Sequence, residues 1–386
     1  MSHYQMKTYL NCSQKSLFIE LLQLSIGTRD CLSRVPSAAE WEGVLDEAQR
    51  QAVVGVLVTG IERLPDEQRP AKLLLLQWIG LCQQTEAQNA LTTNTCIQVC
   101  ERLDQDGFNA CVLKGQSNYR YYPAEMKNRR SCGDVDVWVV PKKESKNPVK
   151  EVVEYVDANY NMDVLCWLHN GFTDENGVPV EVHFRPSFMS EPCKNRRFQK
   201  HFADVDDCRV FVEVDGVEIP AMKVDEDVIY QMNHIYRHLI DEGVGLRQVV
   251  DYFWMLRAWN EQHKRSKEET MKIVSWLGMK KFAGALMYVL REVCGMNEGL
   301  LLCPASVKDG QFLMSEILLS GNFGHGDPRV GASGSEGSYL FRRAGQALRR
   351  FKRNMRFFTS YPGEVIWEPI VRVEHFVWKK FKLWRF

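Results

Sequence analysis

The segment DVDVWVV, residues 134–140, constrains the fold of this chain more than any other stretch. Valines alternate with other residues, and a period of two is typical of a β-strand. On such a strand the valines share one face, while Asp134, Asp136 and Trp138 share the other. The strand must therefore bury its valine face and carry two carboxylates on the opposite face.

Other strands are expected close by in the sequence. The run VPVEVHF, residues 178–184, alternates again after a DENG turn and places Glu181 and His183 on one face. A short apolar run ends in Lys-Gly at residues 109–115, and Asp215-Gly216 predicts a hairpin turn. Strands at this density, separated by helical patterns, predict an α/β or α+β core from about 106 to 220.

Helical patterns flank this core on both sides, because apolar residues there recur at three-to-four spacing. We expect an α+β protein with a small mixed sheet between N-terminal and C-terminal helical regions. The predicted regions are a helical region at 1–105, the core at 106–220, a helical region at 221–320 that closes a cleft, a Gly/Ser-rich linker at 321–340 and a basic, aromatic tail at 341–386.

The acidic residues of the two alternating strands indicate a metal site. Asp134, Asp136 and Glu181 on neighbouring strand faces would repel one another unless a cation lay between them. Hard oxygen ligands select Mg²⁺ or Mn²⁺, and Mg²⁺ held by few carboxylates keeps positions open for phosphates. This arrangement is typical of phosphoryl and nucleotidyl transfer.

The motifs around these acids resemble those of the polymerase-β-like nucleotidyltransferase superfamily. More closely, the chain is similar to a poorly characterised bacterial nucleotidyltransferase family with the pattern LKG, then RxxGDxD, then VExH. Those motifs stand here at residues 113–115, 130–136 and 180–183. Two later histidines followed by Gly-Leu-Arg and an aspartate, at residues 234–251, match the same family.

The resemblance implies roles for the motif residues. Asp134 and Asp136 would bind the metal ion, with Glu181 as the third acid. Gly115 would let the backbone approach the phosphates of a nucleotide at a helix start. Gly133 belongs to the Gly-Asp-x-Asp motif. We therefore expect nucleotidyl transfer from a nucleoside triphosphate to an acceptor hydroxyl of a small molecule, a protein or an RNA.

Further residues are candidates for contact with the nucleotide. Lys114 stands where the wider superfamily usually has Gly-Ser, and it could supply a point charge to a phosphate oxygen. Arg130 could contact phosphate or pair with an acid. His183 could orient substrate, act as a base or be structural. His234 and His238, spaced i, i+4, could line the nucleotide cleft or form hydrogen bonds within the helical layer.

Two other classes of function stay open. The Lys-Gly turn favours a non-catalytic protein of the same fold that binds nucleotide or a partner, for example an antitoxin-like or regulatory protein. Alternatively, His234, His238 and Asp251 could hold a metal ion in a phosphohydrolase.

The charge of the chain is unevenly distributed. Net charge is zero, yet residues 341–386 hold twelve Lys or Arg against three Glu, which makes this tail +9. Its aromatics could pack on the body of the protein, or the tail could contact an anionic membrane surface or RNA. Twelve irregularly spaced cysteines, and an N-terminus without the apolar core of a signal peptide, predict a cytoplasmic protein, peripheral to a membrane if the tail binds lipid.

Overall fold

The computed structural model describes residues 12–381, apart from 325–326, 328, 330–346 and 348–349. Its central sheet has seven strands in the order β3-β4-β5-β2-β1-β7-β6. The strands are β1 Phe108–Val112, β2 Val135–Pro141, β3 Met162–Leu165, β4 His169–Thr173, β5 Pro179–His183, β6 Arg209–Val214 and β7 Val217–Met222. β2 pairs antiparallel with β1 and parallel with β5, so the sheet is mixed, as the sequence predicted.

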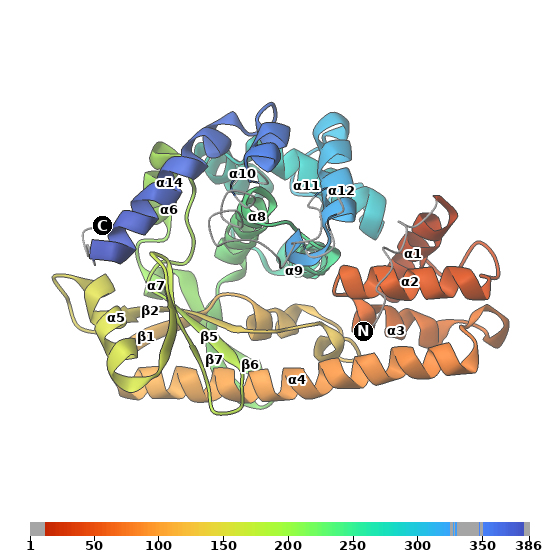
Figure 1. Cartoon of the computed structure of the whole chain (residues 1–386), viewed down its shortest axis with the longest axis horizontal. Coiled ribbons are helices and arrows are strands. Elements are labelled where there is room, and N and C mark those ends of the chain that lie inside the picture. The colour runs from red at the N-terminus through yellow and green to blue at the C-terminus, as the bar shows by residue number, and fades with distance from the viewer. Residues whose placement is uncertain (1–11, 325–326, 328, 330–346, 348–349, 382–386) are drawn as a thin grey trace, which may run out of the picture.

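The two faces of β2 differ chemically. Val135, Val137 and Val139 are fully buried in a core completed by α4 (Lys72–Gln105) and α5 (Pro148–Asn159). Trp138 is buried on the opposite face, within a larger core that includes α8 (Val224–Asp241) and α9 (Leu246–Gln262). Figure 1 shows α4 along one side of the sheet and the later helices on the other. The acid-bearing face therefore looks toward α8.

The described residues before β1, from residue 12 onward, are mostly helical, as their apolar spacing predicted. The helices are α1 Cys12–Ser25, α2 Ala38–Arg50 and α3 Val54–Arg63, followed by α4. Ser37 begins α2 with a capping box, because its side chain accepts from the Glu40 amide while Glu40 accepts from the Ser37 amide. α4, with 34 residues, extends from these helices to the far end of the sheet.

Two helices, α6 Pro192–His201 and α7 Val205–Cys208, lie between β5 and β6. The helices after β7 are α8, α9, α10 Lys267–Trp276, α11 Lys280–Cys294, α12 Val307–Ser320 and α14 Pro362–Phe381. The predicted hairpin joins β6 to β7, with Asp215 and Gly216 both at positive φ. Most of the predicted linker at 321–340 lies outside the described residues.

The described part of the tail packs on the body of the protein. Residues 350–357 are helical and α14 follows them. Phe357 and Trp378 are buried, so body packing, one of the three alternatives for the tail aromatics, holds for these two. Among the described helices, none is long and apolar enough to cross a bilayer.

Asn89, in the middle of α4, fixes the loop that precedes the two aspartates. Its amide nitrogen donates to the carbonyls of Asn128 and Arg130, and its amide oxygen accepts from the backbone N–H of Cys132. The side chain is fully buried. Loss of Asn89 would leave these buried backbone groups without partners.

We predict that Asn89→Ala lowers the free energy of unfolding by about 2–4 kcal/mol, because several buried hydrogen bonds are lost together. Urea unfolding followed by circular dichroism measures this change. The control is Asn159→Ala on α5, where one exposed hydrogen bond to the Tyr155 carbonyl is lost. We expect a change within about 0.5 kcal/mol there. Equal effects of the two substitutions would contradict the role of Asn89.

Candidate active site

Three acidic side chains lie together at the centre of the sheet. The parallel pairing of β2 with β5 sets Asp136 directly beside Glu181, and Asp134 immediately precedes β2. One carboxylate oxygen from each of the three residues lies within 4.8 Å of the others. The side chain of Asp136 is 1% exposed, whereas those of Asp134 and Glu181 are 31% and 34% exposed. The group is thus anchored inside the protein and reachable from outside.

Lys114, which follows β1, supplies a positive charge to these acids. Its Nζ lies 2.6 Å from Asp136 Oδ2 and 3.3 Å from Asp134 Oδ2. Burial acts to lower the pKa of Lys114, but the nearby carboxylates outweigh burial and raise that pKa above its ordinary value. The ammonium that we expected at a phosphate oxygen therefore faces the two aspartates and is charged at neutral pH.

Two histidines extend the acid group along the sheet. His183 Nε2 lies 3.1 Å from Asp136 Oδ1 and 3.2 Å from Glu181 Oε2. Burial acts to lower the pKa of His183, but hydrogen bonds to the two carboxylates raise it. His169 Nδ1 lies 3.2 Å from Glu181 Oε2, and burial lowers the pKa of His169 to about 4. His169, Glu181 and His183 form a second group with ligand atoms within 4.8 Å.

Sequence reasoning missed His169. It lies directly opposite His183 where β4 pairs antiparallel with β5. The DENG turn at residues 174–177 carried this signal, because a hairpin there places the preceding strand beside the one that holds Glu181.

The two motif glycines differ in their surroundings. Gly115 has φ +69°, and a Cβ there would lie 3.1 Å from Cys132 Sγ and 3.5 Å from the Asp134 carbonyl oxygen. Both the backbone conformation and the space therefore favour glycine. A Cβ on Gly133 would meet no atom within 4 Å, so open space lies next to Asp134.

The sequence left open whether Arg130 contacts phosphate or pairs with an acid, and in the structure it pairs with an acid. Its Nε and Nη2 donate to the two carboxylate oxygens of Asp251 at 2.5 and 2.7 Å, and the Tyr122 hydroxyl donates to Asp251 at 2.7 Å. All three residues are buried. This bidentate pair ties the loop before Asp134 to α9.

His234 and His238 both lie on α8. Their rings are neighbours, with centroids 4.3 Å apart, and both side chains are buried. Burial lowers the pKa of both histidines, and Lys114 lies close enough for its positive charge to contribute to that lowering. The suggested His234, His238 and Asp251 metal site is not formed in the described residues, since Asp251 pairs with Arg130 and neither potential metal group includes these histidines.

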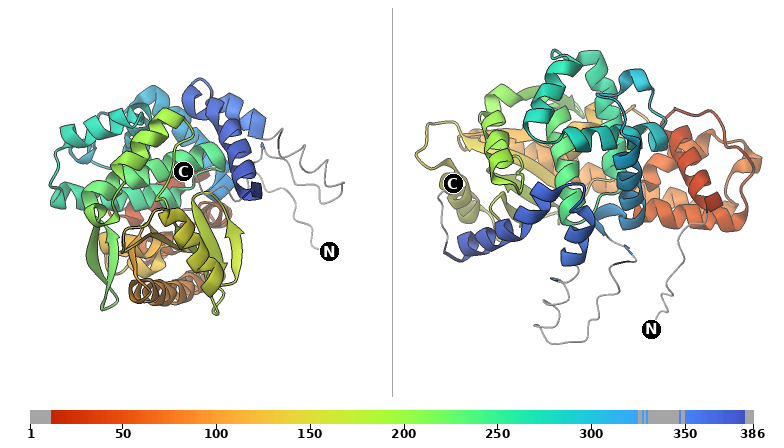
Figure 2. Two further views of the ribbon diagram at one scale, coloured as in Figure 1. Left: turned by 90° about the vertical axis from the view of Figure 1, so that its left-hand side faces the viewer. Right: turned by 90° about the horizontal axis from the view of Figure 1, so that it is seen from above.

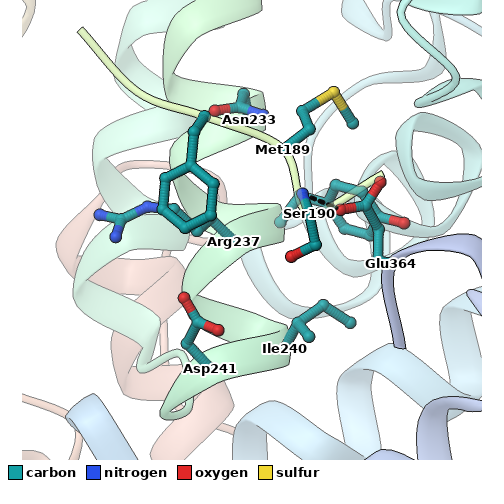
Figure 3. Close-up of a pocket in the computed structure, with 9 residues that line it drawn as sticks. Met189, Ser190, Asn233, Arg237, Ile240, Asp241 and Glu364 are labelled. Atoms are coloured by element: carbon teal, nitrogen blue, oxygen red, sulfur yellow. Dashed lines mark hydrogen bonds between the residues drawn. The ribbon is translucent and has the colours of Figure 1, made fainter. Parts of the chain in front are cut away.

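A cavity of about 160 Å³ begins at His169, beside the acid group. Its walls come from the β3–β4 turn, α8 and α14, and they include Trp167, Phe188, Arg237 and His375. A smaller cavity of about 10 Å³ shares Phe188 and Arg237 with it. In Figure 3, Arg237 and Asp241 extend from α8, and the Ser190 amide donates to Glu364 of α14. The larger cavity is linked to the acid group through His169, which contacts Glu181.

The mixed sheet with three convergent acids is consistent with a nucleotidyltransferase-like fold. Residues 37–295 match the family described as "Uncharacterised nucleotidyltransferase", and the chain belongs to that family. Among solved structures, an antigenic nucleotidyltransferase-like protein from Paracoccidioides brasiliensis is similar at 10% identity and a TM-score of 0.32, over 56% of this chain and 95% of that one. No curated protein matches this chain.

The buried state of His238 predicts a pH-dependent stability. Burial lowers the pKa of His238 to about 4. Between pH ~6.5 and that value the unfolded chain binds a proton that the folded protein excludes, so stability falls as pH falls.

We expect His238 to account for about 2–3 kcal/mol of the fall in unfolding free energy between pH 7.5 and 4.5. Urea unfolding at several pH values measures the free energy of unfolding. In His238→Gln this free energy should fall less steeply with decreasing pH, because the contribution of His238 is absent. His263→Gln, at an exposed position, is the control and should keep the steeper fall. An unchanged slope in His238→Gln would show that other groups carry the dependence.

Proposed function

We propose that this protein transfers a nucleotidyl group from a nucleoside triphosphate to an acceptor hydroxyl, with Mg²⁺ or Mn²⁺ held by Asp134, Asp136 and Glu181. The observation that carries this proposal is the convergence of three carboxylate oxygens within 4.8 Å on adjacent strands. An all-oxygen donor set suits a hard divalent cation, and the partial exposure of Asp134 and Glu181 gives it access. Membership of the family adds independent support.

The reaction follows from this arrangement. The acceptor oxygen forms a bond to the α-phosphorus while the bond from that phosphorus to pyrophosphate breaks, and the hydroxyl proton passes to a carboxylate of the site. A bound divalent cation would supply charge neutralisation on the triphosphate and polarisation of the acceptor hydroxyl. Gly133 leaves open space beside Asp134, and the cavity lined by His169, which contacts Glu181, would offer room for part of the acceptor.

Lys114 has two successive partners in this proposal. Without a divalent cation it neutralises Asp134 and Asp136. A divalent cation would compete with the Lys114 ammonium for the same carboxylate oxygens, which frees the ammonium for a phosphate oxygen of the nucleotide. Lys114 thus keeps the acids together in one state and binds substrate in the other.

The same ion pair supports a second candidate function, a non-catalytic protein that binds a nucleotide or a partner. A carboxylate group already neutralised by a buried lysine needs no metal for stability. The two candidates differ in whether radiolabel from the α-phosphate becomes covalently attached to an acceptor.

We predict that Asp136→Asn lowers label transfer at least about 100-fold, because the most buried ligand of the cation loses its charge. The assay incubates the full chain with Mg²⁺, α-³²P-labelled triphosphates, and small-molecule, protein or RNA acceptor pools. Asp134→Asn should act in the same direction. The control is Glu213→Gln, which should leave transfer unchanged. Glu213 is an exposed acid on β6, an edge strand of the sheet.

Absence of transfer with every triphosphate and pool, together with thermal stabilisation by Mg²⁺ and a non-hydrolysable triphosphate, would favour the nucleotide-binding candidate. Absence of both would favour a protein that binds a partner. Transfer that survived Asp136→Asn would reject the acid group as the site.

A further prediction concerns the competition at Lys114. Lys114→Met should bind Mn²⁺ at least about tenfold more tightly than the natural chain, because a like charge is removed from the site. Isothermal titration with Mn²⁺ measures this, and Lys114→Arg, which keeps the charge, is the matched control. Equal Mn²⁺ affinity in Lys114→Met and the natural chain would contradict the competition.

A further inference from the structure

α14 has two faces of different character. Its inner face is buried against the body through Val365, Val371 and Trp378. Its outer face exposes an apolar stripe at helical spacing, made of Ile366, Ile370, Val373, Val377 and Phe381. Trp367 and Phe376 flank this stripe and are also exposed. A helix that belonged only to a globular core would leave polar residues on its outer face.

The preceding helical segment repeats this pattern. Phe351, Met355 and Phe358 are exposed at i, i+4 and i+7. On the opposite face Arg353 is buried and donates to the carbonyls of Leu239, Ile240 and Glu242, at the end of α8. Its guanidinium therefore caps α8 and fixes the segment to the body. α14 and the helical segment before it lie on the same side of the molecule in both views of Figure 2.

These stripes concentrate the exposed apolar side chains of the described residues. Ten of the twenty large hydrophobic residues that are exposed lie between residues 351 and 381. Such a concentration marks an interaction surface rather than the scattered exposure that is usual for a soluble protein.

The charge around the stripes identifies the kind of partner. The tail is +9 in sequence. Of its three glutamates, Glu364 and Glu368 are buried, which leaves Glu374 as the exposed acid. Lys352, Lys379 and Lys380 are exposed beside the apolar residues. An apolar stripe with basic flanks complements an anionic lipid surface, where the stripe enters the headgroup boundary and the lysines meet lipid phosphates.

We propose that α14 and residues 351–358 form a docking surface for an anionic phospholipid membrane, with α14 lying in the plane of the interface. The centre of the α14 stripe is aliphatic, with Ile366, Ile370, Val373 and Val377, and this favours lipid over nucleic acid, which is bound through aromatic stacking and a continuous basic track. The exposed basic charge opposes symmetric pairing of two copies. Because His375 and Val371 of α14 also line the cavity at His169, docking holds that cavity close to the headgroups.

Vesicle flotation of the full chain tests this proposal. At 100 mM salt we expect binding to vesicles of phosphatidylcholine with 30% phosphatidylglycerol, and at least tenfold weaker binding to phosphatidylcholine alone. Ile370→Glu with Val373→Glu should lower the partition coefficient at least tenfold. The matched control is Leu73→Glu with Leu76→Glu, two exposed leucines on α4, which should bind as the natural chain does.

The contribution of the lysines beside the apolar stripe is tested separately. Lys379→Ala and Lys380→Ala should each weaken binding to the anionic vesicles about fivefold, with little effect on phosphatidylcholine vesicles. The substituted residues of α14 (Ile370, Val373, Lys379 and Lys380) are all exposed. The thermal unfolding midpoints of these variants should therefore match that of the natural chain.

Three outcomes would overturn the proposal. The first is no binding to anionic vesicles by the folded natural chain. The second is equal loss of binding in the α4 control. The third is a dimer or an RNA complex that the Ile370→Glu, Val373→Glu variant loses while vesicle binding is absent, which would assign the surface to that partner.

Discussion

Charge neutralisation at the centre of the sheet is the constraint on which the site depends. Asp134, Asp136 and Glu181 lie close enough to repel one another strongly in a partly buried setting. Lys114 and His183 oppose that repulsion through direct contacts with Asp136. Because Asp136 is almost fully buried, an uncompensated charge there would cost several kcal/mol. A positive charge at this position therefore stabilises the local fold.

The loop that carries Asp134 is held from both sides of the sheet. On the α4 side, Asn89 forms hydrogen bonds with the backbone of this loop. On the other side, the buried pair between Arg130 and Asp251 connects the loop to α9. These contacts position the aspartates without taking part in the acid group. The geometry of the site thus rests on two helices that the sheet keeps apart.

The features predicted from the sequence are those with a local signal. Alternation in residues 134–140 and 178–184 gave the strands and the shared face of their acids, which the parallel register of β2 and β5 then brought together. The partner of Arg130 had no such signal, because Asp251 lies 121 residues away and only tertiary packing selects it. His169 could have been predicted as a site residue, because the register of the β4–β5 hairpin sets it directly opposite His183. For the tail, composition indicated several partners, and only the fold shows which face of α14 is covered.

α4 belongs to both hydrophobic cores. Its first turns contribute Trp78 and Cys82 to the larger core, which also includes the N-terminal helices, α8 and α9, and its last turns contribute Val99 and Leu103 to the core beneath the sheet. One rod therefore serves as the spine of two regions that the sequence alone would separate near residue 105. Cutting the chain there would remove the helix that covers the valine face of the sheet, so the sheet and the N-terminal helices depend on the same structural support.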